Sequence, residues 1–280
     1  MCRCRAWRMK PEMIAEDIRK RLRDLEDREK AKILQRFFKT GPGEYGEGDF
    51  FLGIPVPRLR KLSKECDETD LGEVEALIES SVHEERLLAL LILIRKYNRE
   101  GESGKKRIYG LYLKNTRWIN NWDLVDLSAP NIIGDFLMNR SRKPLYRLAR
   151  SPVLWERRVA ILATFHFIRQ QQFDETLRIC EILISDKEDL IHKAVGWMLR
   201  EVGKRDRRAE EAFLRKHYRQ MPRTMLRYAI ERFPAAKRER FMKGGKGTLS
   251  PVHKASKCRR FSWLLSKGGS LRQAKWEGLV

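Results

Sequence analysis

A short apolar pattern recurs along the chain and decides the fold: RVAI at 158–161, HKAV at 192–195 and RYAI at 227–230. Aligning the apolar centres of the expected helices extends the series backwards, at intervals of 36, 35, 34 and 35 residues, through Ala89, Val125, Ala160, Ala194 and Ala229. A period of roughly 30–47 residues built only of helices is typical of an α-solenoid, which uses its concave face for binding. Helix centres in any bundle can also fall at such intervals, so the period alone leaves that alternative open.

The rest of the chain also has helical rather than strand-like periodicity, with Gly and Pro mostly between the periodic segments. We expect a long amphipathic stretch over 13–38 and helices over 57–64, 71–80 and 84–97. Later periodic stretches begin near Trp118, Pro152, Asp174, Glu188, Ala209 and Met221. The sequence therefore predicts an all-α protein with short connections between antiparallel helices.

The chain is strongly basic, with 60 Lys+Arg against 38 Asp+Glu and a formal charge of +22 over 280 residues. Residues 1–11 carry +4 and residues 243–280 carry +8, which leaves 22 − 4 − 8 = +10 for residues 12–242. A folded body with this excess favours a polyanionic partner, although solvated helix faces can also be basic. We expect a folded domain over 13–242, with disordered basic extensions over 1–12 and 243–280.

Several protein classes are disfavoured. The longest apolar run, 87–94, is far shorter than the roughly 20 residues of a membrane span. No apolar stretch follows the basic residues at the N-terminus, so we expect no secretory signal. Five scattered cysteines do not form a disulfide framework, which indicates a reducing cytoplasm as the location.

Two sequence motifs have structural explanations that outweigh the functional ones. GPGEYG at 41–46 matches G-x-G-x-x-G, but no strand precedes it and no helix start follows, so we expect a tight loop. HEE at 83–85 lacks the second histidine of a zinc motif, and Ser81 with Glu84 fits a helix capping box. We predict no metal site.

The most unusual segment is RWINNWDLVD at 117–126. On a helix, Trp122 and Asp126 are i,i+4 neighbours, so an aromatic ring and a carboxylate share one face. A half-buried tryptophan beside a salt-bridged aspartate is the structural alternative. Trp155 and Trp197 lie in two further segments that mix aromatic and cationic residues, as nucleic-acid-binding surfaces do.

Four motifs in the same order resemble the AlkD-type DNA glycosylases, the DNA alkylation repair proteins built of HEAT-like repeats. The motifs are F-L-G-I-x-x-P at 51–57, W-D-x-V-D at 122–126, W-x-x-R-x-A-I-L at 155–162 and K-A-x-G-W-x-L-R-E at 193–201. The resemblance runs from about residue 13 to 242. It implies a superhelix of HEAT-like antiparallel helix pairs whose concave face binds DNA.

The resemblance also implies an activity: excision of N3- and N7-alkylated purines from double-stranded DNA without a metal or cofactor. It carries Trp122, Asp126 and Trp197 onto the family's catalytic positions and Arg158 onto its active-site arginine. Asp126 would stabilise positive charge on the sugar and position water, the tryptophans would pack against the sugar, and Arg158 would hold a phosphate.

Candidate phosphate contacts follow from charge and from proximity to the motif helices: Arg58, Arg60, Lys193, Arg200, Lys204, Arg223 and Arg227. We expect a monomer that does not bind membranes. Two alternatives stay open: a non-catalytic relative that binds damaged or branched DNA, and a protein-binding HEAT scaffold. The second leaves the basic body unexplained, and the salt dependence of DNA binding would separate the two.

Overall fold

The computed structural model describes residues 13–244, and these residues form helices joined by short connections, apart from one long connection over 38–55. The first half contains α1 (Ala15–Arg23), α2 (Arg28–Phe37), α3 (Val56–Ser63), α4 (Leu71–Ile78), α5 (His83–Arg99), α6 (Glu102–Lys114), η1 (Thr116–Trp118), α7 (Trp122–Ala129), η2 (Pro130–Gly134) and α8 (Asp135–Leu137). The second half contains α9 (Lys143–Ala149), α10 (Leu154–Arg169), α11 (Asp174–Leu183), α12 (Asp189–Arg205), α13 (Arg207–His217), α14 (Arg223–Ala229), η3 (Ile230–Arg232) and α15 (Ala235–Gly244).

The predicted all-α class is confirmed for the described part of the chain. Its only extended pairing is an isolated bridge between Phe50 and Val82. No helix in residues 13–244 is long and apolar enough to cross a membrane. The two basic extensions expected to be disordered lie outside the described residues, apart from residues 243–244, which are the end of α15.

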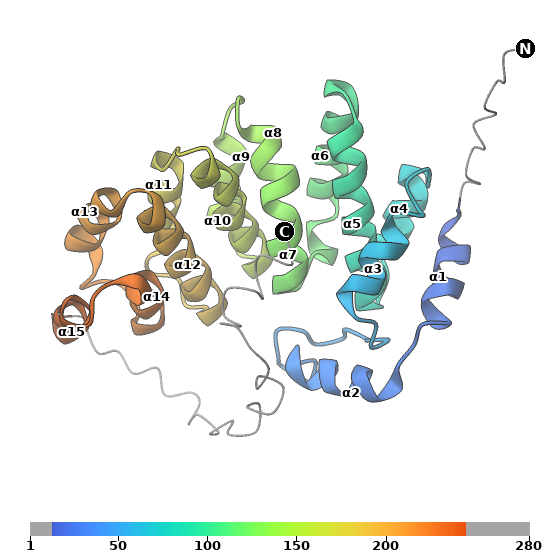
Figure 1. The fold of residues 1–280 in the computed structure, drawn as a ribbon, viewed down its shortest axis with the longest axis horizontal. Helices are drawn as coiled ribbons and strands as arrows, with labels where there is room; N and C mark the ends of the chain where they lie inside the picture. Colours follow the sequence, from blue (N-terminus) through green and yellow to red (C-terminus); the bar gives the residue numbers. More distant parts are fainter. Residues whose placement is uncertain (1–12, 245–280) are drawn as a thin grey trace, which may run out of the picture.

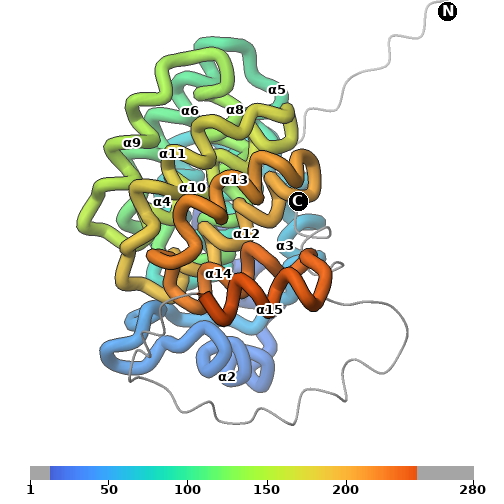
Figure 2. Tube along the Cα trace, turned by 90° about the vertical axis from the view of Figure 1, so that its left-hand side faces the viewer, coloured from blue at the N-terminus to red at the C-terminus, as the bar shows by residue number. Residues whose placement is uncertain are grey.

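The helices follow one another along an arc from α3 to α14, with α2 across its lower edge (Figure 1). Helix α2 also lies at the lower edge in the view turned by 90° (Figure 2). The series α5, α7–η2, α10, α12 and α14 runs through the arc, each member packing against the next. Helices α4, α9, α11 and α13 pack beside this series, against α5, α10 and α12.

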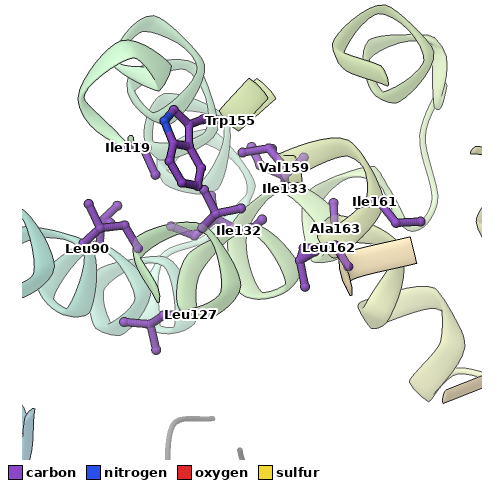
Figure 3. Packing of buried hydrophobic residues seen from close by; sticks show 14 of the residues in the cluster. Leu90, Ile119, Leu127, Ile132, Ile133, Trp155, Val159, Ile161, Leu162 and Ala163 are labelled. Carbon is purple, nitrogen blue, oxygen red and sulfur yellow. The ribbon is translucent and has the colours of Figure 1, made fainter. Parts of the chain in front are cut away.

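One hydrophobic core connects the series. Figure 3 shows Leu90 of α5, Ile132 of η2 and Val159 of α10 within the same buried cluster, with the Trp155 ring packed near Ile119. The five residues that mark the sequence period are all buried in the structure: Ala89, Val125, Ala160, Ala194 and Ala229. The shared burial explains why small or apolar residues recur there.

Close approach of neighbouring helices explains the glycine in the motif at 193–201. A Cβ atom on Gly196 would lie 2.4 Å from the Met225 carbonyl oxygen and 2.5 Å from Cβ of Tyr228. Both atoms belong to α14, so only glycine allows α12 and α14 to pack at this distance. Gly134 has the same role against α10, where an added Cβ would meet the Ala163 carbonyl oxygen at 2.3 Å.

The expected stretch over 13–38 is two helices rather than one. Helix α1 ends at Arg23, and Asp27 begins α2 by accepting a hydrogen bond from the Lys30 backbone N–H at 3.1 Å. This N-cap is the physical reason for the break, since an aspartate that caps the second helix cannot continue the first. The expected loop after α2 is confirmed as a series of turns over 41–48.

The predicted capping box at the start of α5 is wrong. Val82 is the N-cap residue and no side chain caps this helix. The Glu84 carboxylate instead accepts the backbone N–H groups of Leu52, Gly53 and Ile54, at 2.9, 2.8 and 3.2 Å. Glu84 therefore fixes the F-L-G-I segment, a contact across about 30 residues that no local signature reveals.

Candidate active site

Asp126 and Arg158 form a buried ion pair between α7 and α10. Nε of Arg158 donates to Oδ1 of Asp126 at 2.8 Å, and Nη2 donates to Oδ2 at 2.8 Å. Nη1 of Arg158 donates to the Leu190 carbonyl oxygen at 2.6 Å, at the start of α12. The side chains of Arg158 and Asp126 are only 5% and 4% exposed. The planar guanidinium thus fixes the plane of the carboxylate.

The surroundings of Asp126 act on its proton affinity in opposite directions. Burial raises the pKa of Asp126, while the charge and hydrogen bonds of Arg158 lower it, and the balance lies above the ordinary aspartate value. A carboxylate held in this way interacts more strongly with a nearby positive charge than one in water, because the local dielectric constant is low.

Trp122 begins α7 one turn before Asp126. The Asn121 side chain caps this helix by accepting the Trp122 backbone N–H at 2.8 Å. The Trp122 indole stacks on Phe38, with ring centroids 5.2 Å apart and planes at 14°, and Phe37 meets it edge-on at 6.1 Å. The structure thus bears out the i,i+4 relation of Trp122 and Asp126 on one helix.

A buried polar network fastens the start of α7 to α5. The two ring nitrogens of His83 contact Oδ2 of Asp49 at 3.3 Å and Oδ2 of Asp123 at 2.8 Å. Asp49 also accepts hydrogen bonds from Arg86 at 2.6 Å and from Asn121 at 3.2 Å. These contacts connect the end of the loop after α2 with the first turns of α5 and α7.

The network shifts the pKa values of two of its members. Burial alone would lower the pKa of His83, but the charge and hydrogen bond of Asp123, with the hydrogen bond of Asp49, raise it to about 9. Burial would raise the pKa of Asp49, but its contacts with His83 and Arg86 bring it below the ordinary value. His83 is therefore a cation at neutral pH, with a carboxylate on each side.

Trp197 lies farther along the helix series than the ion pair. Its indole N–H donates to Glu201 at 3.2 Å, and its ring meets that of Phe165 at 5.7 Å. Arg158 meets α12 at Leu190, and Trp197 follows two turns later, or roughly 10 Å along a helix axis. The structure brings Trp122, Asp126 and Arg158 close together and places Trp197 on the next helix, beyond them.

The seven candidate phosphate contacts differ in their surroundings. Arg58 and Arg227 are exposed. Arg60 is turned inward, because its Nε and Nη2 atoms are buried without a hydrogen-bond partner. The other four are engaged within the described chain: Lys193 with Asp189, Arg200 with Glu231, Lys204 with Glu201, and Arg223 with the Met242 carbonyl oxygen.

Sequence reasoning missed two contributors to the site, Phe38 and Tyr45. Phe38 covers one face of Trp122, and the Tyr45 ring meets the Trp155 ring edge-on, with centroids 6.1 Å apart. Both lie outside the four motifs, and Tyr45 belongs to a loop that has no periodicity. The only available signal was an aromatic residue within the glycine-rich segment 41–46. Within residues 13–244, no cluster of His, Cys, Asp and Glu could hold a metal ion.

Comparisons with known proteins bear on the family and on the fold. The sequence model of a family described as "DNA alkylation repair enzyme" matches residues 18–233. Among solved structures, a "Predicted DNA alkylation repair enzyme from Enterococcus faecalis" is similar, with a TM-score of 0.59 and 18% sequence identity. The match covers 75% of this chain and 97% of that one, and at this identity it shows the fold alone. A search of curated proteins finds no significant match.

Proposed function

Because the chain belongs to the DNA alkylation repair enzyme family, we propose that it is a DNA glycosylase acting on N3- and N7-alkylated purines in duplex DNA. The observation that carries the proposal is the buried carboxylate of Asp126, oriented by Arg158 one turn from the Trp122 ring. A glycosylase for cationic bases needs such a fixed negative charge beside the sugar.

The chemistry follows from the lesion. The bond between the alkylated purine and C1′ of the sugar breaks, and its electron pair leaves with the base, which becomes neutral. Positive charge then develops on the deoxyribose until water attacks C1′ and loses a proton. Asp126 stabilises the developing charge through a low-dielectric environment and orients the water, and Trp122 offers its ring face to the cationic sugar.

Arg158 acts mainly on Asp126 in the free protein. Three of its N–H groups are directed at Asp126 and Leu190, so its first role is to keep the carboxylate ionised and in one plane. The phosphate contact that the resemblance implies would use the remaining N–H groups. Trp197 would then contact the nucleotide from α12, farther along the helix series.

The proposal includes the architecture. The arc of packed helices supports a HEAT-like solenoid whose concave face receives duplex DNA. The exposed Arg58 and Arg227 are phosphate contacts in this arrangement, and Lys193, Arg200, Lys204 and Arg223 would exchange their present partners for phosphates. Arg60 would join them only after turning outward. DNA affinity should fall steeply with salt as counterions are released.

Single-turnover release of N7-methylguanine from duplex DNA tests the activity. Asp126→Asn keeps the size of the side chain and removes its charge, and should slow release by about 10²–10³-fold. The matched control is Asp174→Asn, which removes an exposed aspartate on α11 and should leave the rate unchanged. All rates are corrected for spontaneous loss of base from DNA alone.

Two outcomes would reject the proposal. If Asp126→Asn releases base as fast as the unmodified protein, the mechanism fails. If the unmodified protein binds lesion-containing duplex in a salt-dependent way but releases no base, the chain is a DNA-binding relative without glycosylase activity.

A further inference from the structure

The two residues that flank Trp122 in the sequence both belong to one buried polar network. Oδ2 of Asp123 lies 2.8 Å from Nε2 of His83. Nδ2 of Asn121 donates to Oδ2 of Asp49 at 3.2 Å, and the same oxygen lies 3.3 Å from Nδ1 of His83. The imidazole of His83 therefore holds the chain on both sides of Trp122, directly on one side and through Asp49 on the other.

The flanking side chains also set the first turn of α7. The Asn121 side chain accepts the Trp122 backbone N–H at 2.8 Å, and Oδ1 of Asp123 accepts the Leu124 backbone N–H at 2.9 Å. Each of the two side chains thus uses one atom for the helix and another for the network. A displacement of either one would move the start of α7, and Asp126 lies on the next turn of that helix.

His83 is itself held firmly enough to support other groups. Its side chain is only 2% exposed. The His83 ring stacks on Phe51, with centroids 4.4 Å apart and planes at 22°, and meets the Phe38 ring at 5.1 Å. Phe38 in turn stacks on the Trp122 indole. His83 therefore lies behind Trp122 in the aromatic stack as well as in the polar network.

Apolar packing alone would not keep this side of α7 in place. A cavity of about 320 Å³ borders it, and Phe38, Phe51, His83 and Asp123 are among the residues that line this cavity. A side chain beside a cavity has fewer van der Waals partners on that side. The position of Asp123 therefore depends on its hydrogen bonds, and above all on the contact with His83.

We propose that His83 is a positioning residue of the active site, which holds the chain on both sides of Trp122 so that the indole and the Asp126 carboxylate keep the arrangement needed for base release. The inference rests on the proposed glycosylase function. Because His83 is buried and acts through Asp49 and Asp123, its loss slows the chemical step and leaves DNA affinity unchanged.

The test compares His83→Ala with His83→Gln in single-turnover release of N7-methylguanine from duplex DNA. A glutamine amide can replace the Nε2 contact with Asp123, whereas alanine makes neither contact. His83→Ala should slow release at saturating protein by about 10–100-fold, because a misplacement of about 1 Å in an active site can cost about 10²-fold. His83→Gln should lose no more than about fivefold, as for one hydrogen bond. Both variants should keep the DNA dissociation constant of the unmodified protein.

The matched control is His166→Ala. His166 also lies beside a carboxylate, with Nε2 3.7 Å from Oδ1 of Asp135, but it follows Arg158 by eight residues on α10. Its truncation should leave the release rate unchanged. Every rate is referred to the folded protein, which urea unfolding of each variant in the assay buffer measures.

The outcomes separate the two proposals. An unchanged release rate for folded His83→Ala overturns the positioning role, and so does a loss confined to DNA affinity. Equal losses from His83→Ala and His83→Gln overturn it as well. If His83→Ala does not fold, Asp123→Ala removes the partly exposed partner of the same contact, and an unchanged rate for this variant overturns the role. If the unmodified protein releases no base, the glycosylase proposal itself fails, and the role of His83 in base release fails with it.

Discussion

His83 provides the sharpest test of how the site is held together. Its imidazole is buried between Asp49 and Asp123, and the pKa of His83 is about 9 against an ordinary 6.5. We predict that the folded protein loses stability as the pH rises through this range. The variant His83→Gln, which is polar but carries no charge at any pH, should lack that loss.

The magnitude follows from the pKa. A shift from 6.5 to about 9 corresponds to about 3 kcal/mol of preferential stabilisation of the protonated imidazole in the folded state. Because the folded-state pKa is raised, this contribution is present in full below about pH 6.5 and disappears as the pH passes about 9. The carboxylates of Asp49 and Asp123 then remain buried beside a neutral ring.

Urea unfolding at pH 6.5 and pH 9.5 measures the effect. The unmodified protein should lose about 3 kcal/mol more of its unfolding free energy between these conditions than His83→Gln does. Groups that titrate in both proteins cancel in this difference. The control is His166→Gln: burial lowers the pKa of His166, so this variant should keep the alkaline loss. Equal losses in the unmodified protein and His83→Gln would refute the reasoning.

Three further predictions follow from the described contacts. Gly196→Val should lower the unfolding free energy in urea by about 2 kcal/mol or more, because the new side chain meets the α14 backbone; an unchanged midpoint would contradict the close packing. Glu84→Gln should cost about 1–3 kcal/mol in the same assay, since a neutral amide offers one acceptor oxygen to three backbone N–H groups. As the pH falls, base release should decline at a pH above the ordinary aspartate range, because burial raises the pKa of Asp126. Arg158→Met removes the charge that lowers this pKa, so it should move the decline to still higher pH. A single-turnover rate that stays flat down to pH 4 would contradict the role of Asp126.

Periodicity in the sequence was sufficient to predict the helix series but not every helix. The patterns around Ala160, Ala194 and Ala229 predict buried helix positions because a small residue at each position allows close packing. Helices α6 and α9 went unpredicted. Glycines at 101, 104 and 110 weaken the helical signal of α6, and α9 is only seven residues long.

The candidate site was predictable only where its residues are local or belong to the motifs. The shared helix face of Trp122 and Asp126 follows from a spacing of four residues. The Asp126–Arg158 pair joins residues 32 positions apart, and only the family resemblance placed both in one site. Tyr45 reaches Trp155 of α10 from a loop, and Glu84 acts on a segment about 30 residues earlier. Such contacts depend on tertiary packing, which propensity and periodicity do not encode.

A contribution to stability does not by itself explain why the Asp126 carboxylate is buried. Taking a carboxylate and a guanidinium out of water is costly, and a well-packed apolar pair of similar volume is often as stable or more so. Val125 and Leu127 on α7 and Val159 and Ala160 on α10 are buried and apolar, so such a pair would suit this layer of the core. A fixed negative charge beside a developing cation, in contrast, is what hydrolysis of a cationic nucleoside requires. Burial of the Asp126–Arg158 ion pair therefore argues against a purely structural role and supports a catalytic role for the Asp126 carboxylate.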